Sequence, residues 1–165
     1  MGTEIERKFL VRTDAWRNAP VSRRIAIRQG YLVAGEGASV RIRLADGEAT
    51  LTIKGERDGR TREEFEYAVP AADAEGLLAL CPLPPIEKTR HEISHGGKLW
   101  EVDEFSGPLT GLVMAELELD SADEFFELPD WLGEEVTHDR RYRNSSLVRE
   151  AAPPSPPSGK STSAG

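Results

Sequence analysis

The first stretch with residue types that could do chemistry is Glu4–Val11, where two carboxylates and a lysine alternate with other residues. Side chains on a β-strand alternate between two faces, so Glu4, Glu6 and Lys8 share one face. Two carboxylates spaced in this way can supply oxygen ligands to a hard divalent cation, and the lysine can hold an anion beside it. A solvated strand face would give the same triplet, so the interpretation depends on the later strands.

Later segments repeat this pattern, with charged side chains at alternate positions. The polar residues predicted to share the corresponding face are Arg41, Arg43, Thr52, Lys54, Glu64, Glu66, Lys88, Arg90, Glu101, Asp103, Glu116 and Glu118. Like charges on one face of a sheet repel each other, and a sheet selected only for stability would not repeat that arrangement. A metal–polyphosphate complex explains it, because carboxylates bind divalent metals whereas arginine and lysine bind phosphate.

The alternation of polar and apolar positions predicts eight strands that position these residues. They cover residues 4–11, 25–33, 39–44, 49–54, 62–69, 86–94, 99–105 and 112–119. Short turns join most of them, which favours an antiparallel sheet or barrel in a mainly β (α+β) fold. Short helices are predicted near residues 13–16, 71–80, 121–126, 130–132 and 139–147.

Composition and charge exclude several classes of function. The chain has 165 residues, of which 38% are hydrophobic, and this predicts one globular domain. The net charge of -8 argues against nucleic acid or an anionic membrane as a partner. A single cysteine, Cys81, allows no internal disulfide, and no apolar run reaches the length of a membrane helix, so we expect a cytoplasmic protein. Residues 151–165, rich in Pro, Ser and Gly, are predicted to form a disordered tail.

The series of motifs resembles that of the CYTH family, the triphosphate tunnel metalloenzymes, and in particular its small bacterial inorganic triphosphatases. The motifs in question are Glu4-x-Glu6-x-Lys8, Arg41-x-Arg43, Lys54, Glu64-x-Glu66, Lys88-x-Arg90, Glu101-x-Asp103 and Glu116-x-Glu118. The resemblance implies an eight-stranded antiparallel β-barrel that forms a tunnel, with the charged face inside and flanking helices packed outside. Residues 1–150 would then be the CYTH domain.

The resemblance also implies roles for individual residues. Lys8, Arg41, Arg43, Lys54, Lys88 and Arg90 would bind the triphosphate, and Glu4, Glu6, Glu64, Glu66, Asp103, Glu116 and Glu118 would bind one or two Mg²⁺ or Mn²⁺ ions. The catalytic residues would be Lys8 and Tyr31, the latter as a group that handles a proton. A phenol with a pKa of about 10 is a poor base at neutral pH, so a packing role for Tyr31 is an equal alternative. Glu101 is either a metal ligand or a support for the ligands.

The predicted function is metal-dependent hydrolysis of inorganic triphosphate (tripolyphosphate) to pyrophosphate and phosphate. Three alternatives stay open: a class IV adenylate cyclase, a thiamine triphosphatase, and a non-catalytic module that binds polyphosphate or a nucleotide. The compact length favours the small triphosphatases over the cyclases, by analogy within one fold. The expected partner is a small molecule that contains a triphosphate, and a homodimer is a further expectation because related proteins are often dimers.

Overall fold

The computed structural model describes residues 2–34, 37–56, 58, 61–150 and 152–157, and it describes side chains from residue 5 onward. Its strands are β1 (Gly2–Val11), β2 (Val21–Ala34), β3 (Ser39–Ala45), β4 (Glu48–Lys54), β5 (Thr61–Val69), β6 (Ile86–His95), β7 (Lys98–Phe105), β8 (Val113–Glu118) and β9 (Leu132–Glu135). Its helical turns are η1 (Asp14–Asn18), η2 (Ala71–Asp73), α1 (Ala74–Ala79), η3 (Gly107–Leu109), η4 (Arg140–Tyr142) and α2 (Asn144–Leu147).

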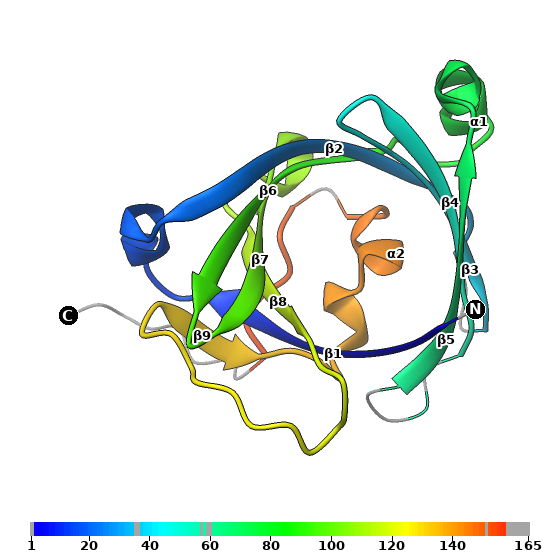
Figure 1. Cartoon of the computed structure of the whole chain (residues 1–165). Helices are drawn as coiled ribbons and strands as arrows, with labels where there is room; N and C mark the ends of the chain where they lie inside the picture. The colour runs from blue at the N-terminus through cyan, green and yellow to red at the C-terminus, as the bar shows by residue number, and fades with distance from the viewer. Residues whose placement is uncertain (1, 35–36, 57, 59–60, 151, 158–165) are drawn as a thin grey trace.

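Eight of these strands close into an antiparallel barrel, which confirms the fold that the family resemblance implies. The hydrogen-bonded order is β5-β4-β3-β2-β6-β7-β8-β1, and an additional pairing between β1 and β5 completes the ring (Figure 1). The short strand β9 pairs with the C-terminal end of β1, at Phe9 and Val11. Closure removes the exposed edges that an open sheet would leave and creates an interior that the alternate residues of every strand face.

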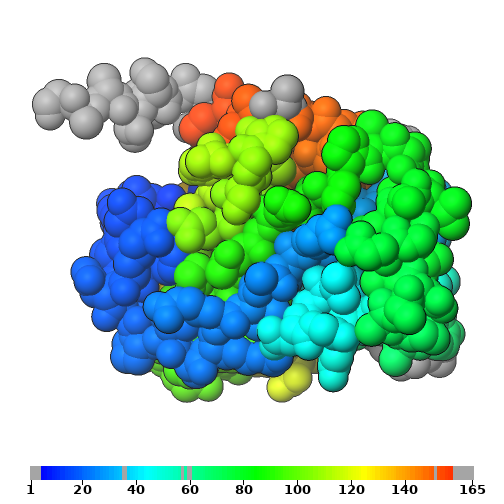
Figure 2. Space-filling model, turned by 90° about the horizontal axis from the view of Figure 1, so that it is seen from above, coloured from blue at the N-terminus to red at the C-terminus, as the bar shows by residue number. Residues whose placement is uncertain are grey.

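The apolar residues on the outer face of the barrel are covered by short segments rather than by long helices. On one side Trp100 and Leu117 pack in a buried cluster with Trp16 of η1 and with Trp131. On another side Ile42 packs with Leu78 of α1. Figure 2 shows the segment that contains α1, in green, on the side of the barrel opposite the blue segment that contains η1. Burial of these apolar side chains on the outer face stabilises the fold.

Arg7 is the one charged residue on the apolar face of the first strand, and the structure explains it. Its guanidinium donates to both carboxylate oxygens of Glu135 on β9, with Nε–Oε2 at 2.5 Å and Nη2–Oε1 at 2.6 Å. The same guanidinium lies 5.1 Å from the ring centre of Phe126. Arg7 thus fastens β9 to the outside of the barrel.

The segment near the C-terminus differs from the expectation that the helices pack outside. Figure 1 shows α2 within the ring of strands, and η4 and α2 close one end of the barrel. Tyr142 and Leu147 are buried there, in a cluster with Phe105 and Met114 from the inner face. This end of the interior is therefore apolar and filled, and the segment acts as a plug; from here on, "the plug" means residues 140–147.

The helices predicted at residues 121–126 and 130–132 are wrong. The first stretch is a turn followed by extended chain, and the second is a turn that leads into β9. The ring of Phe126 packs at 5.9 Å from that of Trp100, and the Glu124 carboxylate accepts a hydrogen bond from the Asp120 backbone N–H. Packing onto the barrel therefore decides the conformation of this loop, against its local helix signal. No helix in the described part of the chain has the length and apolar character needed to cross a membrane.

The predicted tail lies partly within the described residues. Residues 152–157 contain no helix or strand. The hydroxyl of Tyr142 in the plug donates to the backbone carbonyl of Ser155 at 2.9 Å.

Deletion of residues 151–165 is expected to leave the fold intact, because the described part of this segment adds no strand and offers Tyr142 an acceptor that water can replace. We expect the melting temperature to change by less than about 3 °C. Tyr142→Phe in the full chain is the matched control, since it removes the same hydrogen bond. A truncated protein that melts more than about 8 °C below the wild type would contradict this.

Candidate active site

The barrel encloses a cavity with a strongly cationic lining. The lining residues are Glu6, Lys8, Tyr31, Ser39, Arg41, Arg43, Thr52, Lys54, Arg62, Lys88, Arg90, Glu116, Asn144 and Ser145. Among these described residues are seven cationic side chains and two carboxylates, although the whole chain has a net charge of -8. The structure thus brings together all six residues that the sequence predicts to bind triphosphate.

An adjoining cavity in the same tunnel is lined by carboxylates as well as cations. Its carboxylates are Glu6, Glu64, Glu66, Glu101, Glu116 and Glu118, and Arg41, Arg43, Lys54 and Arg90 border both cavities. The strand register places Glu6 directly opposite Glu118, and Glu101 directly opposite Glu116. Like charges in such positions repel each other, and a cation between them would remove that cost. Burial, and to a smaller extent Glu116, raises the pKa of Glu101, whereas Arg90 opposes the shift.

The six carboxylates of this second cavity, called the acidic wall below, supply the oxygen ligands that a hard divalent cation prefers. In the part of the chain whose side chains are described, no three carboxylate, histidine or cysteine residues form a ready-made metal cage. Mg²⁺ is commonly held by one or two carboxylates together with substrate phosphates and water, so a complete cage is not required. Of the predicted ligands, Glu4 has its backbone in β1, and its side chain lies outside the described residues.

Asp103 lies beneath the cationic lining rather than on the acidic wall. Its Oδ2 atom accepts from Lys88 Nζ at 2.7 Å, and its two oxygens accept from Arg90 Nε and Nη2 at 2.8 and 2.9 Å. The Asp103 side chain is 1% exposed. Burial opposes its ionisation, but Arg90 and Lys88 outweigh burial and hold the pKa of Asp103 well below its usual range. The predicted role of Asp103 as a metal ligand stays a prediction, and the structure places it as the counter-ion that orients two cations.

Two of the cations are held in an environment that favours an added anion. Burial, reinforced by Arg41 and Arg90, lowers the pKa of Arg43 to about 9. Burial also lowers the pKa of Lys88 to about 7, although Asp103 opposes the shift. A polyanion in the cavity would restore favourable interactions for both charges, which is the usual behaviour of a phosphate site.

Tyr31 and Lys8, the predicted catalytic residues, both line the cationic cavity. Tyr31 is buried and pairs with Arg41 across β2 and β3. Lys8 Nζ donates to the backbone carbonyl of Tyr142 at 3.3 Å and lies 3.5 Å from Glu116 Oε1. Lys8 is therefore tied both to the plug and to the acidic wall.

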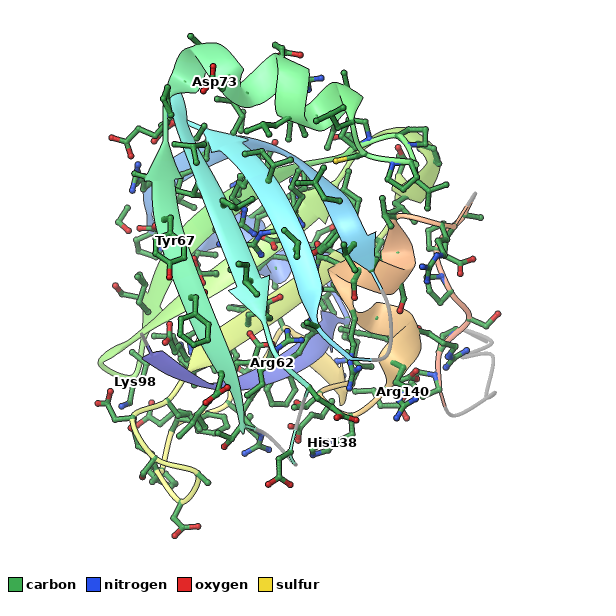
Figure 3. The ribbon with its side chains drawn as sticks, turned by 90° about the vertical axis from the view of Figure 1, so that its right-hand side faces the viewer. Arg62, Tyr67, Asp73, Lys98, His138 and Arg140 are labelled. Carbon is green, nitrogen blue, oxygen red and sulfur yellow. The ribbon has the colours of Figure 1, made fainter. Side chains whose placement is uncertain are left out.

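Sequence reasoning missed several residues of the cavity. Arg62 precedes Glu64 by two positions, so the same alternation places it on the inner face, 3.8 Å from Glu6 Oε1. Figure 3 labels Arg62 at the beginning of β5 and Tyr67 further along this strand, on its outer side. Asn144 and Ser145 carry no charge and come from the plug, so no strand pattern could have indicated them.

Comparisons with known proteins agree with this geometry. The family model of the CYTH domain matches residues 2–151. The chain belongs to the CYTH domain family. This confirms the resemblance seen in the sequence, and membership implies a divalent metal as cofactor.

Two curated relatives match most of the chain. The inorganic triphosphatase of Acetivibrio thermocellus is 45% identical over 150 residues, which are 90% of this chain and 95% of that protein. The inorganic triphosphatase of Nitrosomonas europaea is 38% identical over 152 residues, with coverage of 88% and 97%.

Solved structures agree on the fold of this CYTH chain. The crystal structure of the inorganic triphosphatase NE1496 has a TM-score of 0.64 at 36% identity, and the match covers 90% of this chain and 95% of that one. A Hippeastrum protein with a TM-score of 0.57 and 15% identity, over 72% of this chain and 80% of its own, supports the fold alone.

The Asp103 geometry leads to a test in metal-free buffer. Asp103→Asn would leave the Lys88 and Arg90 charges buried beside each other, so we expect the free energy of unfolding to fall by about 3 kcal/mol in EDTA, measured by urea denaturation. Because the pKa of Asp103 is lowered, its contribution should be present above its unfolded pKa of about 4 and should be lost as the pH falls further. Glu118→Gln, at an exposed position of the acidic wall, should change stability by less than about 1 kcal/mol. Unchanged or increased stability of Asp103→Asn would mean that repulsion from nearby carboxylates outweighs the ion pairs of Asp103 with Lys88 and Arg90, as expected of a metal ligand in metal-free buffer.

Proposed function

We propose that this CYTH protein hydrolyses inorganic triphosphate to pyrophosphate and phosphate in its tunnel, with a divalent metal. The observation that carries the proposal is the excess of cations in an enclosed cavity, where Arg41 Nε is buried without a hydrogen-bond partner among the described residues. A buried donor without an acceptor costs free energy in the empty protein. A phosphate oxygen would supply the missing acceptor.

A triphosphate suits the cavity better than a smaller anion does. The cationic side chains come from β1, β3, β4, β5 and β6, so they surround the interior instead of forming one compact cradle. A linear polyanion can contact several of these strands at once, whereas a single phosphate can contact few. The two curated relatives are named inorganic triphosphatases, which supports this substrate over an organic triphosphate.

The proposed roles are supported by the positions of the described side chains and, for Glu4, by the family resemblance alone. Lys8, Arg41, Arg43, Lys54, Lys88 and Arg90 bind the phosphate oxygens, and the missed residue Arg62 adds a further charge beside Glu6. Glu4, Glu6, Glu64, Glu66, Glu116 and Glu118 hold Mg²⁺ or Mn²⁺ together with the substrate. Asp103, the seventh predicted ligand, would instead serve as the counter-ion of Lys88 and Arg90. When bound, the metal would neutralise phosphate charge and lower the pKa of the attacking water.

The reaction itself requires little covalent chemistry from the protein. Water attacks a terminal phosphorus atom, the bond from that phosphorus to the bridging oxygen breaks, and pyrophosphate leaves. Phosphoryl transfer of this kind depends mainly on positioning and on stabilisation of charge. Lys8, fixed between Glu116 and the Tyr142 carbonyl, is suited to stabilise charge on the leaving group. Tyr31 lines the same cavity as these cations, and its proposed role is to bind a phosphate oxygen or to relay a proton.

Three further expectations belong to this proposal. Residues 1–150 form the catalytic CYTH domain, and residues 151–165 are a tail without a catalytic role. The protein acts in the cytoplasm, in keeping with its free cysteine. It forms a homodimer, which size-exclusion chromatography with light scattering would test.

Activity measurements test the proposal directly. The protein should release phosphate from tripolyphosphate faster than from ATP or thiamine triphosphate, only with a divalent metal, and should form no cyclic AMP from ATP. Arg43→Ala and Lys54→Ala should each lower kcat/KM about 10-fold or more, a change of about 1.4 kcal/mol in the barrier. Arg28→Ala is the matched control, because Arg28 lies on the outside and pairs with Glu75 of α1.

Each alternative function has its own outcome in these assays. Cyclic AMP as the main product would indicate a cyclase, and faster turnover of thiamine triphosphate would indicate a thiamine triphosphatase. Tight binding of tripolyphosphate without turnover in any metal would indicate a binding module. Wild-type kinetics in both Arg43→Ala and Lys54→Ala would show that the cationic cavity is not the site.

A further inference from the structure

A chain of neutral amides connects the plug to the cationic lining. Arg43 Nε donates to Gln29 Oε1 at 2.9 Å, and Gln29 Nε2 donates to Asn144 Oδ1 at 3.0 Å. Lys88 Nζ donates to the same Asn144 oxygen, also at 3.0 Å. Gln29 is completely buried, so its hydrogen bonds cannot be exchanged for bonds to water.

The charged donors at the two ends fix the orientation of both amides. A guanidinium can only donate, so the oxygen of Gln29 must face Arg43 and its NH₂ group must face Asn144. An ammonium can also only donate, so the oxygen of Asn144 must face Lys88 and Gln29. A flip of either amide would set donor against donor. The Asn144 carbonyl oxygen is therefore fully used, and its NH₂ group is directed away from Gln29 and Lys88.

Asn144 also borders the cationic cavity, together with Arg43 and Lys88. Among the described residues, the hydrogen bonds of the Asn144 side chain are those that its oxygen accepts, and its Nδ2 atom donates none. The Asn144 NH₂ group is thus a donor held in a fixed orientation at the plugged end of a phosphate site. Because the charged groups joined to this network are the cations Arg43 and Lys88, an anion is the favoured partner for this donor.

We propose that Asn144 is a substrate-binding residue: its Nδ2 group donates to an oxygen of the phosphate that lies deepest in the tunnel. Gln29 and Lys88 hold the amide in place by occupying its oxygen. Gln29 is then a positioning residue for both Asn144 and Arg43, although it does not line the cavity. The inference rests on the proposed function, because it assumes that the triphosphate lies along Arg43 and Lys88.

Asn144→Asp separates a binding role from a purely structural one. The carboxylate keeps the acceptor that Gln29 and Lys88 require, but it replaces the free donor with an anion. We expect KM for tripolyphosphate to rise about 10-fold or more, with a smaller change in kcat, since a hydrogen bond to a charged group is lost. The melting temperature in EDTA, without phosphate, should stay within about 3 °C of the wild type. If Asn144 serves only as an acceptor, any rise in KM should come from the added charge alone and should match that of a variant with the same charge outside the lining.

Ser146→Asp controls for the added charge. It places a carboxylate on the same short helix about 200° around the axis from Asn144, outside the cavity lining. Both variants should be measured at low salt and at 0.5 M KCl. At 0.5 M KCl the Debye length is well below its value of about 10 Å at 0.1 M, so long-range interactions between charges are screened. A lost contact should keep the KM of Asn144→Asp high at 0.5 M KCl, whereas a field effect should disappear. Equal KM values for the two variants at high salt would overturn the inference.

Failure of the inference can be distinguished from failure of the proposed function. If the wild type hydrolyses tripolyphosphate and Arg43→Ala is impaired, but Asn144→Asp is not, then only the role of Asn144 is wrong. If Arg43→Ala also behaves like the wild type, the substrate lies elsewhere and the proposed function fails. Gln29→Leu should raise KM in the same direction as Asn144→Asp, because it removes the groups that hold both Arg43 and Asn144 in place.

Discussion

The structure depends on one constraint, the confinement of seven described cationic side chains with only two carboxylates in the same cavity. Such a concentration of like charge is costly, and burial of Arg43 and Lys88 adds to that cost, as their lowered pKa values of about 9 and 7 indicate. The fold supports it in two ways. Asp103 neutralises part of the charge through its ion pairs with Lys88 and Arg90. The closed hydrogen-bonded ring of strands leaves no free edge at which the barrel could open.

The remaining features follow from the need to keep this charge enclosed. The apolar side chains that would fill the centre of an ordinary barrel lie on the outer face, where η1, α1 and the loop before β9 cover them. The plug closes one end with a small apolar cluster and also contributes polar groups to the cavity. Cations and carboxylates occupy adjoining parts of one tunnel, so a metal and a polyanion can bind side by side. The outer face of the strands therefore contributes apolar packing, and the inner face of the same strands contributes the charged groups that bind.

The strands and the charged face were predictable because side chains on a strand alternate between two faces. The residue types at alternate positions therefore indicate each face directly. The same period would have indicated Arg62, two positions before Glu64, had it been applied to the whole strand. The position of the plug was not predictable, because residues 140–147 read as an ordinary short helix and only the tertiary fold places them within the ring. Gln29 and Asn144 carry no charge, and their role appears only when the hydrogen bonds between three distant segments are known. Asp103 has the sequence pattern of a metal ligand, whereas burial between Lys88 and Arg90 gives it another set of contacts.

The central claim is that the enclosed charge is a binding site for a linear polyanion. Calorimetric titration of the metal-free protein in EDTA tests it most directly, because tripolyphosphate cannot turn over under that condition. We expect one tripolyphosphate to bind per chain, at least about 10-fold more tightly than pyrophosphate, and pyrophosphate to bind more tightly than orthophosphate, since each added phosphate reaches further cations. Equal affinities for the three anions, or no measurable binding of tripolyphosphate, would contradict it.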